Sequence, residues 1–324
     1  MLSSVFHKYS NYDFMNYLDE NWIEYNIEDN GRVILKSWKA KELLEFLIRK
    51  SEENNIEIQT WQTITKVEKE NDFFKITTQE SEFLCKKLVI STWGISYPQA
   101  WATSFWIDIA KQFWLNTIPS FPALCWLETK EDFSSLSWSS ITGNVELFDW
   151  NKKIYENQWN ILFTHRWLSG PAIFNCSVWL AEYLTKKYLP CHPEWNEGYN
   201  LDSSLLKPST ALRSEWHIQL KITPHQITKK LASLIKGSLS GFSRSGERND
   251  EPEGFYAQIT DFRPLEEAKV SSGWVDMNEI KPNFECKNIP NLYFIWETLD
   301  IIGETGWFNL QRARSGGKIC WQNF

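Results

Sequence analysis

The 324-residue chain contains little glycine, little methionine and no long hydrophobic run. It has 14 glycines, whereas an ordinary frequency of roughly 7% would give about 23. No apolar stretch reaches the ~20 residues that a membrane-spanning helix needs, and the first residues have no apolar core of the signal-peptide kind. Basic residues are not in excess either, because the net charge is −7. We therefore expect a cytoplasmic protein with no membrane partner, and nothing in the composition favours nucleic acid as the main partner.

Clustered metal ligands and paired cysteines are also missing. The six cysteines are far apart and include no CxxC pair, and the five histidines form no HxxxH-like group. The sequence therefore predicts neither a disulfide framework nor a metal site. Tryptophan, in contrast, is abundant, with 19 residues in the chain.

The first hundred residues alternate between helix-like and strand-like patterns. Residues 40–50 carry apolar side chains at helical spacing, and a second helix is expected near 103–114. Period-two or apolar segments predict strands at 56–60, 63–69, 73–78 and 82–91. This order of strand, turn and helix indicates part of an α/β nucleotide-binding domain.

The middle of the chain has a different character. Short strands separated by turns fill residues 119–180 and predict an inserted β-domain, followed by a helical part between about 181 and 237. The polar stretch 238–254 predicts a loop. We expect an α/β domain in two parts, 1–118 and 271–324, split by an insert at 119–270.

Two segments, 88–98 and 292–317, place a buried strand before a tight turn, and in the second a helix follows. A helix start offers free backbone N–H groups and the positive end of the helix dipole, which suits a phosphate or the electron-rich edge of a flavin. Glu297 and Asp300 follow the second strand and could accept hydrogen bonds from sugar hydroxyls. The alternative is an ordinary strand–turn–helix that binds no ligand.

The segment FTHRWLSGPAIF (163–174) contains the tight turn Ser169–Gly170–Pro171. His165 and Ser169 are the candidates for a catalytic role, because a histidine can contact substrate or influence a flavin near neutral pH. The alternative for His165 is a structural hydrogen bond to a hairpin backbone. No serine–histidine–acid triad, phosphate-binding loop or pair of catalytic carboxylates can be assembled from the spacing.

These segments together resemble one flavoprotein family. STWGISYP and the stretch through FPALCWL resemble ATGGxSYP…PALVPL, and THRWLSGPAI is similar to THxGxSGPAI. AKVSSGWVDMNEI…NLYFIWETLDIIGETGWFNLQRARSGG resembles VTAGGVxxxEI…GLYFAGEvLDvdGxtGGYNLQxAxSSG. The pattern is that of the BaiN/YhiN-like oxidoreductases, described as NAD(P)/FAD-dependent enzymes of the aminoacetone oxidase family. The likeness runs from about residue 20 to the C-terminus.

The resemblance implies an FAD-binding Rossmann domain like that of glutathione reductase, split by a β-barrel and a helical piece. It implies FAD as cofactor, NAD(P)H as a possible electron donor, and hydride or electron transfer as the chemistry. The turn after the first strand would lie near the phosphates, and Ile64 near the adenine. The cofactor-binding residues implied in this way are Ile64, Thr92, Trp93, Gly94, Trp296, Glu297, Asp300, Gly306, Trp307, Phe308, Asn309 and Leu310.

The chain departs from the family pattern at its start. The family begins with a strand, a GxGxxG loop and a helix that hold the FAD pyrophosphate, and none of these is present in the sequence. Roughly 80 residues are absent on this comparison, so FAD binding by this chain alone is in question.

The second departure concerns tryptophan at family glycine positions. Glycine serves such positions because they need positive φ or a close backbone approach, and another residue there costs about 1–3 kcal/mol. We interpret these tryptophans as UGA codons that mean glycine in the source; the alternative is a protein with genuine aromatic stacking surfaces. The positions are Trp22, Trp38, Trp61, Trp93, Trp101, Trp106, Trp114, Trp159, Trp167, Trp274, Trp296 and Trp307, whereas Trp179 and Trp216 fit genuine tryptophans.

The sequence thus predicts an FAD-dependent oxidoreductase that acts on a small molecule. A noncatalytic binding module built on a degenerate flavoprotein fold is one alternative, and an FAD-dependent RNA-modifying enzyme is another. The acidic net charge argues against the RNA-modifying alternative.

Overall fold

The computed structural model describes residues 2–29, 31–100, 102–165, 167–188, 217–225 and 254–322. The chain divides into two compact units, each of which mixes helices and strands as an α/β class predicts. Unit 1 consists of Met1–Ile90, Asn278–Ile295 and Leu310–Phe324, and unit 2 of Ser91–Met277 and Trp296–Asn309. The expected division into 1–118, 119–270 and 271–324 stays a prediction.

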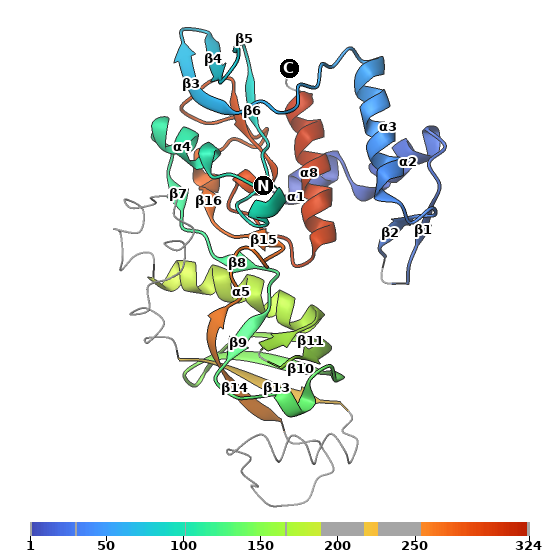
Figure 1. The fold of residues 1–324 in the computed structure, drawn as a ribbon, viewed down its shortest axis with the longest axis vertical. Helices are drawn as coiled ribbons and strands as arrows, with labels where there is room; N and C mark the ends of the chain where they lie inside the picture. Colours follow the sequence, from blue (N-terminus) through green and yellow to red (C-terminus); the bar gives the residue numbers. More distant parts are fainter. Residues whose placement is uncertain are drawn as a thin grey trace, which may run out of the picture. The chain divides into compact units, whose positions relative to one another are not determined.

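The core of unit 2 is a closed barrel of six strands, which are labelled in Figure 1 except for β12. Around the barrel the order is β10, β11, β12, β9, β14 and β13. In chain order the strands are β9 (Leu127–Thr129), β10 (Ser140–Asp149), β11 (Lys152–Phe163), β12 (Trp167–Ser169), β13 (Ile218–Pro224) and β14 (Phe255–Phe262). The expected β-barrel insert is confirmed.

Period-two alternation in the sequence builds this barrel. Along β10, Ile141, Val145 and Leu147 are buried, whereas Thr142 and Asn144 between them are exposed. Successive side chains of a strand point to opposite faces, so this pattern fills the barrel interior and leaves polar groups outside. Closure of the barrel also leaves no unpaired strand edge.

The helix α5 (Pro171–Tyr188) packs against β11 beside the barrel. Gly170, with φ 97°, turns the chain from β12 into the helix, and a Cβ there would lie 2.7 Å from the Asn160 carbonyl oxygen. Proline is favoured in the first turn of a helix because its missing N–H would have no partner there. The helix expected at 181–189 is therefore only the end of a longer one.

The remainder of unit 2 consists of a helix and short paired strands. The helix α4 (Phe105–Gln112) confirms the one expected near 103–114, and it buries Trp106, Ile107 and Ile109. Two antiparallel pairs lie outside the barrel: β7 (Thr117–Ile118) with β16 (Trp274–Val275), and β8 (Pro122–Ala123) with β15 (Val270–Ser271).

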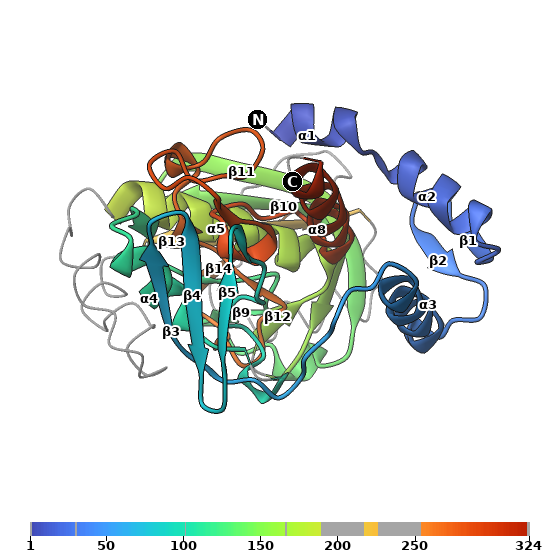
Figure 2. The same cartoon turned by 90° about the horizontal axis from the view of Figure 1, so that it is seen from above.

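Unit 1 contains a parallel pair of strands formed by distant parts of the chain. In this pair β6 (Leu88–Ile90) runs beside β17 (Leu292–Phe294), with Leu292 opposite Leu88. A three-stranded meander precedes β6 along the chain, and Figure 2 shows its strands side by side. Its strands are β3 (Ile64–Glu70), β4 (Phe73–Thr78) and β5 (Glu82–Cys85). The helix α8 (Gly306–Trp321) is shared by the two units: its residues up to Asn309 belong to unit 2, and those from Leu310 onward belong to unit 1.

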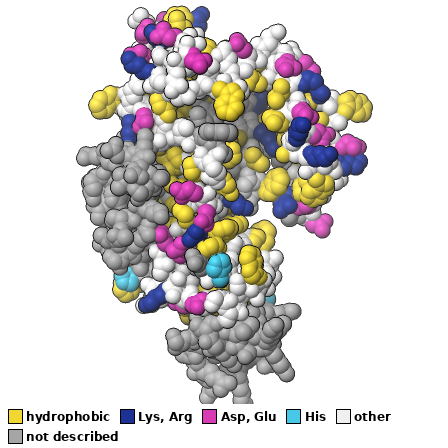
Figure 3. Space-filling model, viewed as in Figure 1, with side chains coloured by type: hydrophobic (Ala, Val, Ile, Leu, Met, Phe, Trp, Pro, Cys, Tyr) yellow, Lys and Arg dark blue, Asp and Glu magenta, His cyan; other side chains and the backbone are white. Residues whose placement is uncertain are grey.

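The first sixty residues of unit 1 form a small helical cluster. It comprises α1 (Leu2–Lys8), α2 (Asn11–Glu20), β1 (Tyr25–Ile27), β2 (Val33–Leu35) and α3 (Ala40–Glu53). Ser10 and Asp13 form a capping box that starts α2. Leu18 and Phe46 pack together in its core, whereas Leu44, Leu47 and Ile48 on another face of α3 are exposed. Hydrophobic side chains are visible at the surface over this part of the chain in Figure 3.

One expected strand does not form. Residues 56–60 alternate like a strand, yet no described strand pairs with them, and Ile56 and Ile58 are exposed. A strand needs a neighbour for its backbone hydrogen bonds, so the pattern alone does not produce one. The helical part expected at about 181–237 is wrong at residues 218–224, which form β13 of the barrel. Residues 189–216 and 226–237, and the loop expected at 238–254 apart from Gly254, lie outside the described residues.

Tryptophan is unusually frequent among the residues whose backbone has a positive φ. Of the 14 non-glycine residues with positive φ among the described residues, eight are tryptophans. A bulky side chain adopts this region rarely, because Cβ crowds the backbone there. Their φ values are 59° at Trp22, 58° at Trp38, 63° at Trp61, 57° at Trp114, 66° at Trp138, 54° at Trp150, 92° at Trp274 and 62° at Trp296.

Candidate functional site

The turn after β6 is held against a buried carboxylate. The Gly94 N–H donates a hydrogen bond to Glu297 Oε2 at 3.0 Å, and the Glu297 side chain is 4% exposed. A Cβ at Gly94 would lie 2.7 Å from Ser271 Oγ and 2.8 Å from Glu297 Oε2. A larger residue at 94 would therefore have to displace one of these two polar side chains.

A second carboxylate lies close along the same segment. Asp300 Oδ1 accepts a hydrogen bond from the Gly273 N–H at 3.1 Å. Burial raises the pKa of Asp300 to about 6, while the bond from Gly273 opposes this shift. Gly273 has φ 89°, and a Cβ there would lie 2.3 Å from the Pro119 carbonyl oxygen. The turn before β16 thus presents its backbone N–H to a carboxyl that titrates near neutrality.

The start of α8 is organised by a buried amide. Asn309, 4% exposed, accepts a hydrogen bond from the Gly303 N–H at 2.8 Å and donates to the Thr305 carbonyl at 3.3 Å. This side chain ties the loop before the helix to its first turn. A Cβ at Gly303 would lie 2.5 Å from the Phe308 Cβ, so the loop passes close over the helix start.

The first turn of α8 exposes apolar side chains. Trp307 is 41% exposed, Phe308 57% and Leu310 44%, and the space around Gly306 is open. Free N–H groups at a helix start, next to exposed apolar surface, suit a flat, electron-rich ring system better than they suit water.

The backbone of this site suits a flavin nucleotide, but not all of its side chains do. Buried carboxylates, close glycine backbones and an open helix start are the groups that such a cofactor uses. The indoles of Trp93 and Trp296, however, pack against each other over the turn with ring centroids 5.6 Å apart. Trp296 also has a φ of 62°, which glycine would adopt without strain. Glycine at both positions would remove the two rings.

The structure gathers most of the predicted cofactor residues within unit 2. Thr92, Trp93 and Gly94 lie with the 296–309 segment, whereas Ile64 in β3 and Leu310 belong to unit 1. Their role toward a cofactor stays a prediction.

His165 and Ser169 lie at opposite ends of β12. His165 is exposed in the turn before the strand, and its ring lies 5.4 Å from that of Trp167. Ser169 is 6% exposed, next to the Gly170 turn. This placement brings the two side chains to different surroundings, so they do not form a nucleophile–base pair. A separate role for either one stays a prediction.

Sequence reasoning missed the partners of the two carboxylates. Ser271 lies against Gly94 and accepts a hydrogen bond from Trp274 Nε1 at 3.1 Å, and Gly273 bonds Asp300. Both sit in the AKVSSGW segment that carried part of the family resemblance, and this was the signal that could have marked them. Spacing alone gives no sign that residues near 94, 272 and 297 meet.

Other kinds of site have less support. Among the described residues no group of histidine, cysteine and acidic side chains could hold a metal ion. The helices that the structure describes include none long and apolar enough to span a membrane.

Comparison with known proteins identifies a matching family and two similar proteins. A family model described as HI0933-like protein Rossmann domain matches residues 1–323. A ribosomal RNA dihydrouridine synthase of Escherichia coli is 26% identical, over 99% of this chain and 80% of its own length. A protein of the same description from Haemophilus influenzae is 27% identical, over 98% of this chain and 81% of its own length.

These comparisons confirm the expected family and its Rossmann fold. They contradict the expected partner. The sequence indicated a small-molecule substrate and no nucleic acid, but both relatives are named for a reaction on ribosomal RNA. The net charge of −7 misled because it sums over the whole chain, whereas a nucleic acid contacts one surface.

Proposed function

The chain belongs to the family of HI0933-like proteins with a Rossmann domain, and from that premise we propose that it is a flavin-dependent enzyme that reduces uridine in ribosomal RNA to dihydrouridine. The observation that supports this proposal most directly is the likeness to two ribosomal RNA dihydrouridine synthases over 98–99% of the chain. An RNA-modifying enzyme was one of the alternatives that the sequence left open.

The reaction adds two electrons and two protons across one bond. The C5–C6 double bond of uracil becomes a single bond, with one hydride and one proton added to the two carbons. Bound FAD in its reduced form would supply the hydride, and NAD(P)H, as the resemblance implies, would supply the electrons that reduce it. The proton comes from water or from a side chain near the base.

The residues of unit 2 suggest how the cofactor is held. Glu297, which is buried, and Asp300, which is half-buried, can accept hydrogen bonds from sugar hydroxyls, and Gly94 lets the backbone come close. Asn309 keeps the loop before α8 in place, so that the N–H groups of the helix start point at one position. Burial of Glu297 keeps water away from these hydrogen bonds and strengthens them.

The test is the dihydrouridine content of ribosomal RNA. Purified protein, FAD and NADPH or NADH are incubated with unmodified ribosomal RNA, and digested nucleosides are separated and weighed by mass spectrometry. We expect dihydrouridine to appear with at least one of two proteins: the unsubstituted chain, or the double variant Trp93→Gly and Trp296→Gly. Glu297→Gln should reduce the rate at least tenfold, on the order of one lost charge-assisted hydrogen bond.

Glu80→Gln is the matched control, because Glu80 is exposed in the turn between β4 and β5. It should leave the rate unchanged. A folded, colourless protein that forms no dihydrouridine, even with glycine at 93 and 296, would contradict the proposal and favour the noncatalytic binding module.

A further inference from the structure

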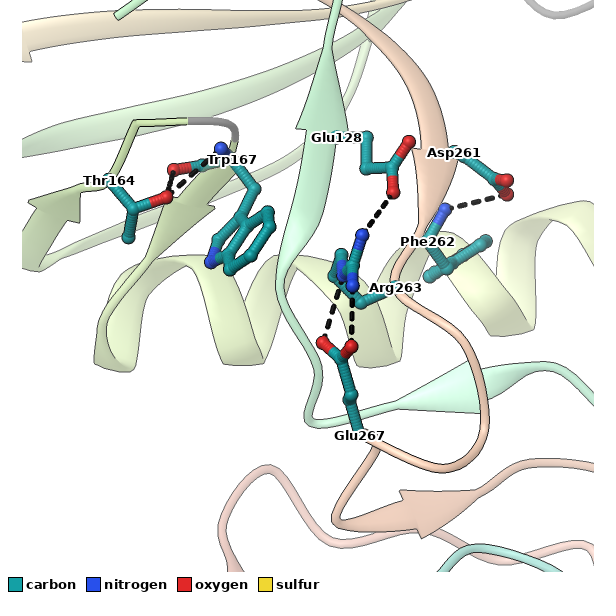
Figure 4. A network of polar contacts seen from close by, with 7 residues as sticks. All are labelled: Glu128, Thr164, Trp167, Asp261, Phe262, Arg263 and Glu267. Atoms are coloured by element: carbon teal, nitrogen blue, oxygen red, sulfur yellow. Dashed lines mark hydrogen bonds and ion pairs between the residues drawn. The ribbon is translucent and has the colours of Figure 1, made fainter. Parts of the chain in front are cut away.

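Arg263, directly after β14, is held by two carboxylates on the barrel of unit 2 (Figure 4). Its Nε donates to Glu267 Oε2 at 2.9 Å, and a second guanidinium nitrogen bonds the other oxygen of Glu267. The remaining terminal nitrogen donates to Glu128 Oε1 at 2.8 Å. A two-point contact of this kind fixes the plane of the guanidinium as well as its position.

The charges of this cluster decide what it can bind. One arginine faces two glutamates, and all three guanidinium nitrogens already donate to carboxylate oxygens. A phosphate would meet net negative charge and few free donors, so the cluster is a poor anion site. What remains available is the flat face of the guanidinium, on a side chain that is 20% exposed.

An aromatic ring occupies that face in this chain. The Arg263 guanidinium carbon lies 4.3 Å from the centre of the Trp167 ring. Trp167 in turn stacks on Trp126, with an angle of 5° between their planes and 5.3 Å between centroids. The Thr164 hydroxyl accepts a hydrogen bond from the Trp167 N–H at 3.0 Å and so fixes the start of β12. The Trp167 ring therefore contacts both a guanidinium and a parallel indole.

We propose that the face of Arg263 is a stacking platform for a base of the RNA substrate, and that residue 167 controls access to it. Position 167 is a glycine in the family pattern that the THRWLSGPAI segment resembles. With glycine there, the surfaces of Arg263 and Trp126 that the Trp167 ring contacts are open to another flat ring; with tryptophan, the indole covers them. Proteins commonly hold unpaired RNA bases on aromatic rings and guanidinium planes, which makes a base the fitting occupant. This inference rests on the proposed function only for its choice of RNA.

The test compares two RNA probes with the full chain. One is a short oligouridylate, and the other is an abasic RNA of the same length, which keeps the phosphates but lacks bases. Trp167→Gly should bind oligouridylate about tenfold more tightly than the unsubstituted chain, a change of about 1.4 kcal/mol. Binding of the abasic RNA should not change. Trp167→Ala is a second variant that uncovers the same surfaces with a residue any strand accepts.

Arg263→Lys in the Trp167→Gly background should abolish the gain, because lysine keeps the charge but has no flat face. The matched control is Arg49→Lys on α3, where a guanidinium carbon lies 5.8 Å from the Phe46 ring, and it should keep the gain. Circular dichroism shows whether each variant is folded. If an arginine variant is unfolded, photocrosslinking of 5-bromouridine RNA to the Trp167→Gly protein replaces it, and the crosslink should fall on the peptide that contains Trp126.

The inference is overturned if both variants at 167 bind oligouridylate as weakly as the unsubstituted chain. It is equally overturned if the abasic RNA gains as much as oligouridylate, if Arg263→Lys keeps the gain, if Arg49→Lys loses it, or if the crosslink maps elsewhere. Each of these results leaves dihydrouridine formation to be measured separately, so failure of the platform and failure of the proposed reaction are distinct outcomes.

Discussion

Several tryptophans that replace family glycines also have a positive φ, so sequence and structure mark the same positions. Trp22, Trp61 and Trp114 combine a φ of about 60° with side chains that are 86–92% exposed. Their indoles gain almost no burial, so the hydrophobic effect offsets little of the cost of the left-handed backbone. We propose, from this pattern and the family glycines, that these positions carry glycine in the protein as its source makes it. Peptide mass spectrometry of protein from that source would test this, and tryptophan at all three positions would refute it.

The same pattern predicts a gain in stability on substitution. Trp22→Gly, Trp61→Gly and Trp114→Gly should each raise the free energy of unfolding by about 1 kcal/mol, measured by urea titration. Trp179→Gly is the control, because Trp179 lies inside α5 and stacks on Tyr155. Glycine in a helix interior should lower the free energy of unfolding by about 1 kcal/mol. A loss of stability at 22, 61 and 114 would show that the indoles are accommodated there.

The raised pKa of Asp300 predicts that the free energy of unfolding depends on pH. Burial raises its pKa in the folded state to about 6, above the ~3.9 of an unfolded chain. The folded state therefore binds the proton more tightly. The stability that this provides is complete below about pH 4 and is lost as the pH rises through 6. Across that window Asp300 should lower the free energy of unfolding by about 2–3 kcal/mol.

Asp300→Asn removes this titration, since an amide stays neutral at every pH. The difference in unfolding free energy between Asp300→Asn and the unsubstituted chain should grow in favour of the variant from pH 4 to pH 7. Urea titrations at several pH values measure it. A difference that stays constant with pH would mean that the folded carboxyl titrates at its ordinary value.

At the scale of elements, the turn between β15 and β16 depends on one glycine. Gly273→Ala would place a methyl group 2.3 Å from the Pro119 carbonyl, at a φ of 89°. We expect a loss of at least about 2 kcal/mol in unfolding free energy, from strain and from a displaced strand. Gly306→Ala is the control, because the space around Gly306 is open and alanine favours a helix. Equal effects of the two substitutions would show that the turn tolerates a Cβ.

Elements that depend on local pattern could be predicted from the sequence. Apolar spacing located α3, and alternation located β3 and β4 to within a residue or two. The motif after β17 located Glu297, which is buried, and Asp300, which is half-buried. What failed depends on distant pairing: residues 56–60 found no neighbouring strand, and the contacts of Ser271 and Gly273 arise only when the chain folds.

At the scale of the whole molecule, the family pattern predicts a further nucleotide-binding unit with a glycine-rich loop. Ile56 and Ile58 are exposed in a strand-like segment with which no described strand pairs. In the chain as it stands, Ile58→Lys should change the unfolding free energy by less than about 0.5 kcal/mol, as exposed substitutions do. Val67→Lys, the buried comparison in β3, should unfold the protein.

Expression of the gene together with its upstream region tests the expected unit directly. If that region adds the nucleotide-binding unit, Ile58→Lys should become destabilising, and the purified protein should retain more FAD, seen as absorbance near the visible flavin bands. An unchanged tolerance of lysine at 58 and no gain in bound flavin would contradict the expectation.

The parallel pair of β6 and β17 has a consequence for the order of events during synthesis. Leu88 and Leu292 are neighbours in space, so the ribosome must finish the whole barrel before the partner of β6 exists. Domains generally fold as units while the chain emerges, and pairing between distant strands is slow. The barrel therefore has time to close first. The backbone groups of β6 that pair with β17 stay unpaired until the last part of the chain is released. In this interval the unpaired backbone groups of β6 are open to pairing with other chains.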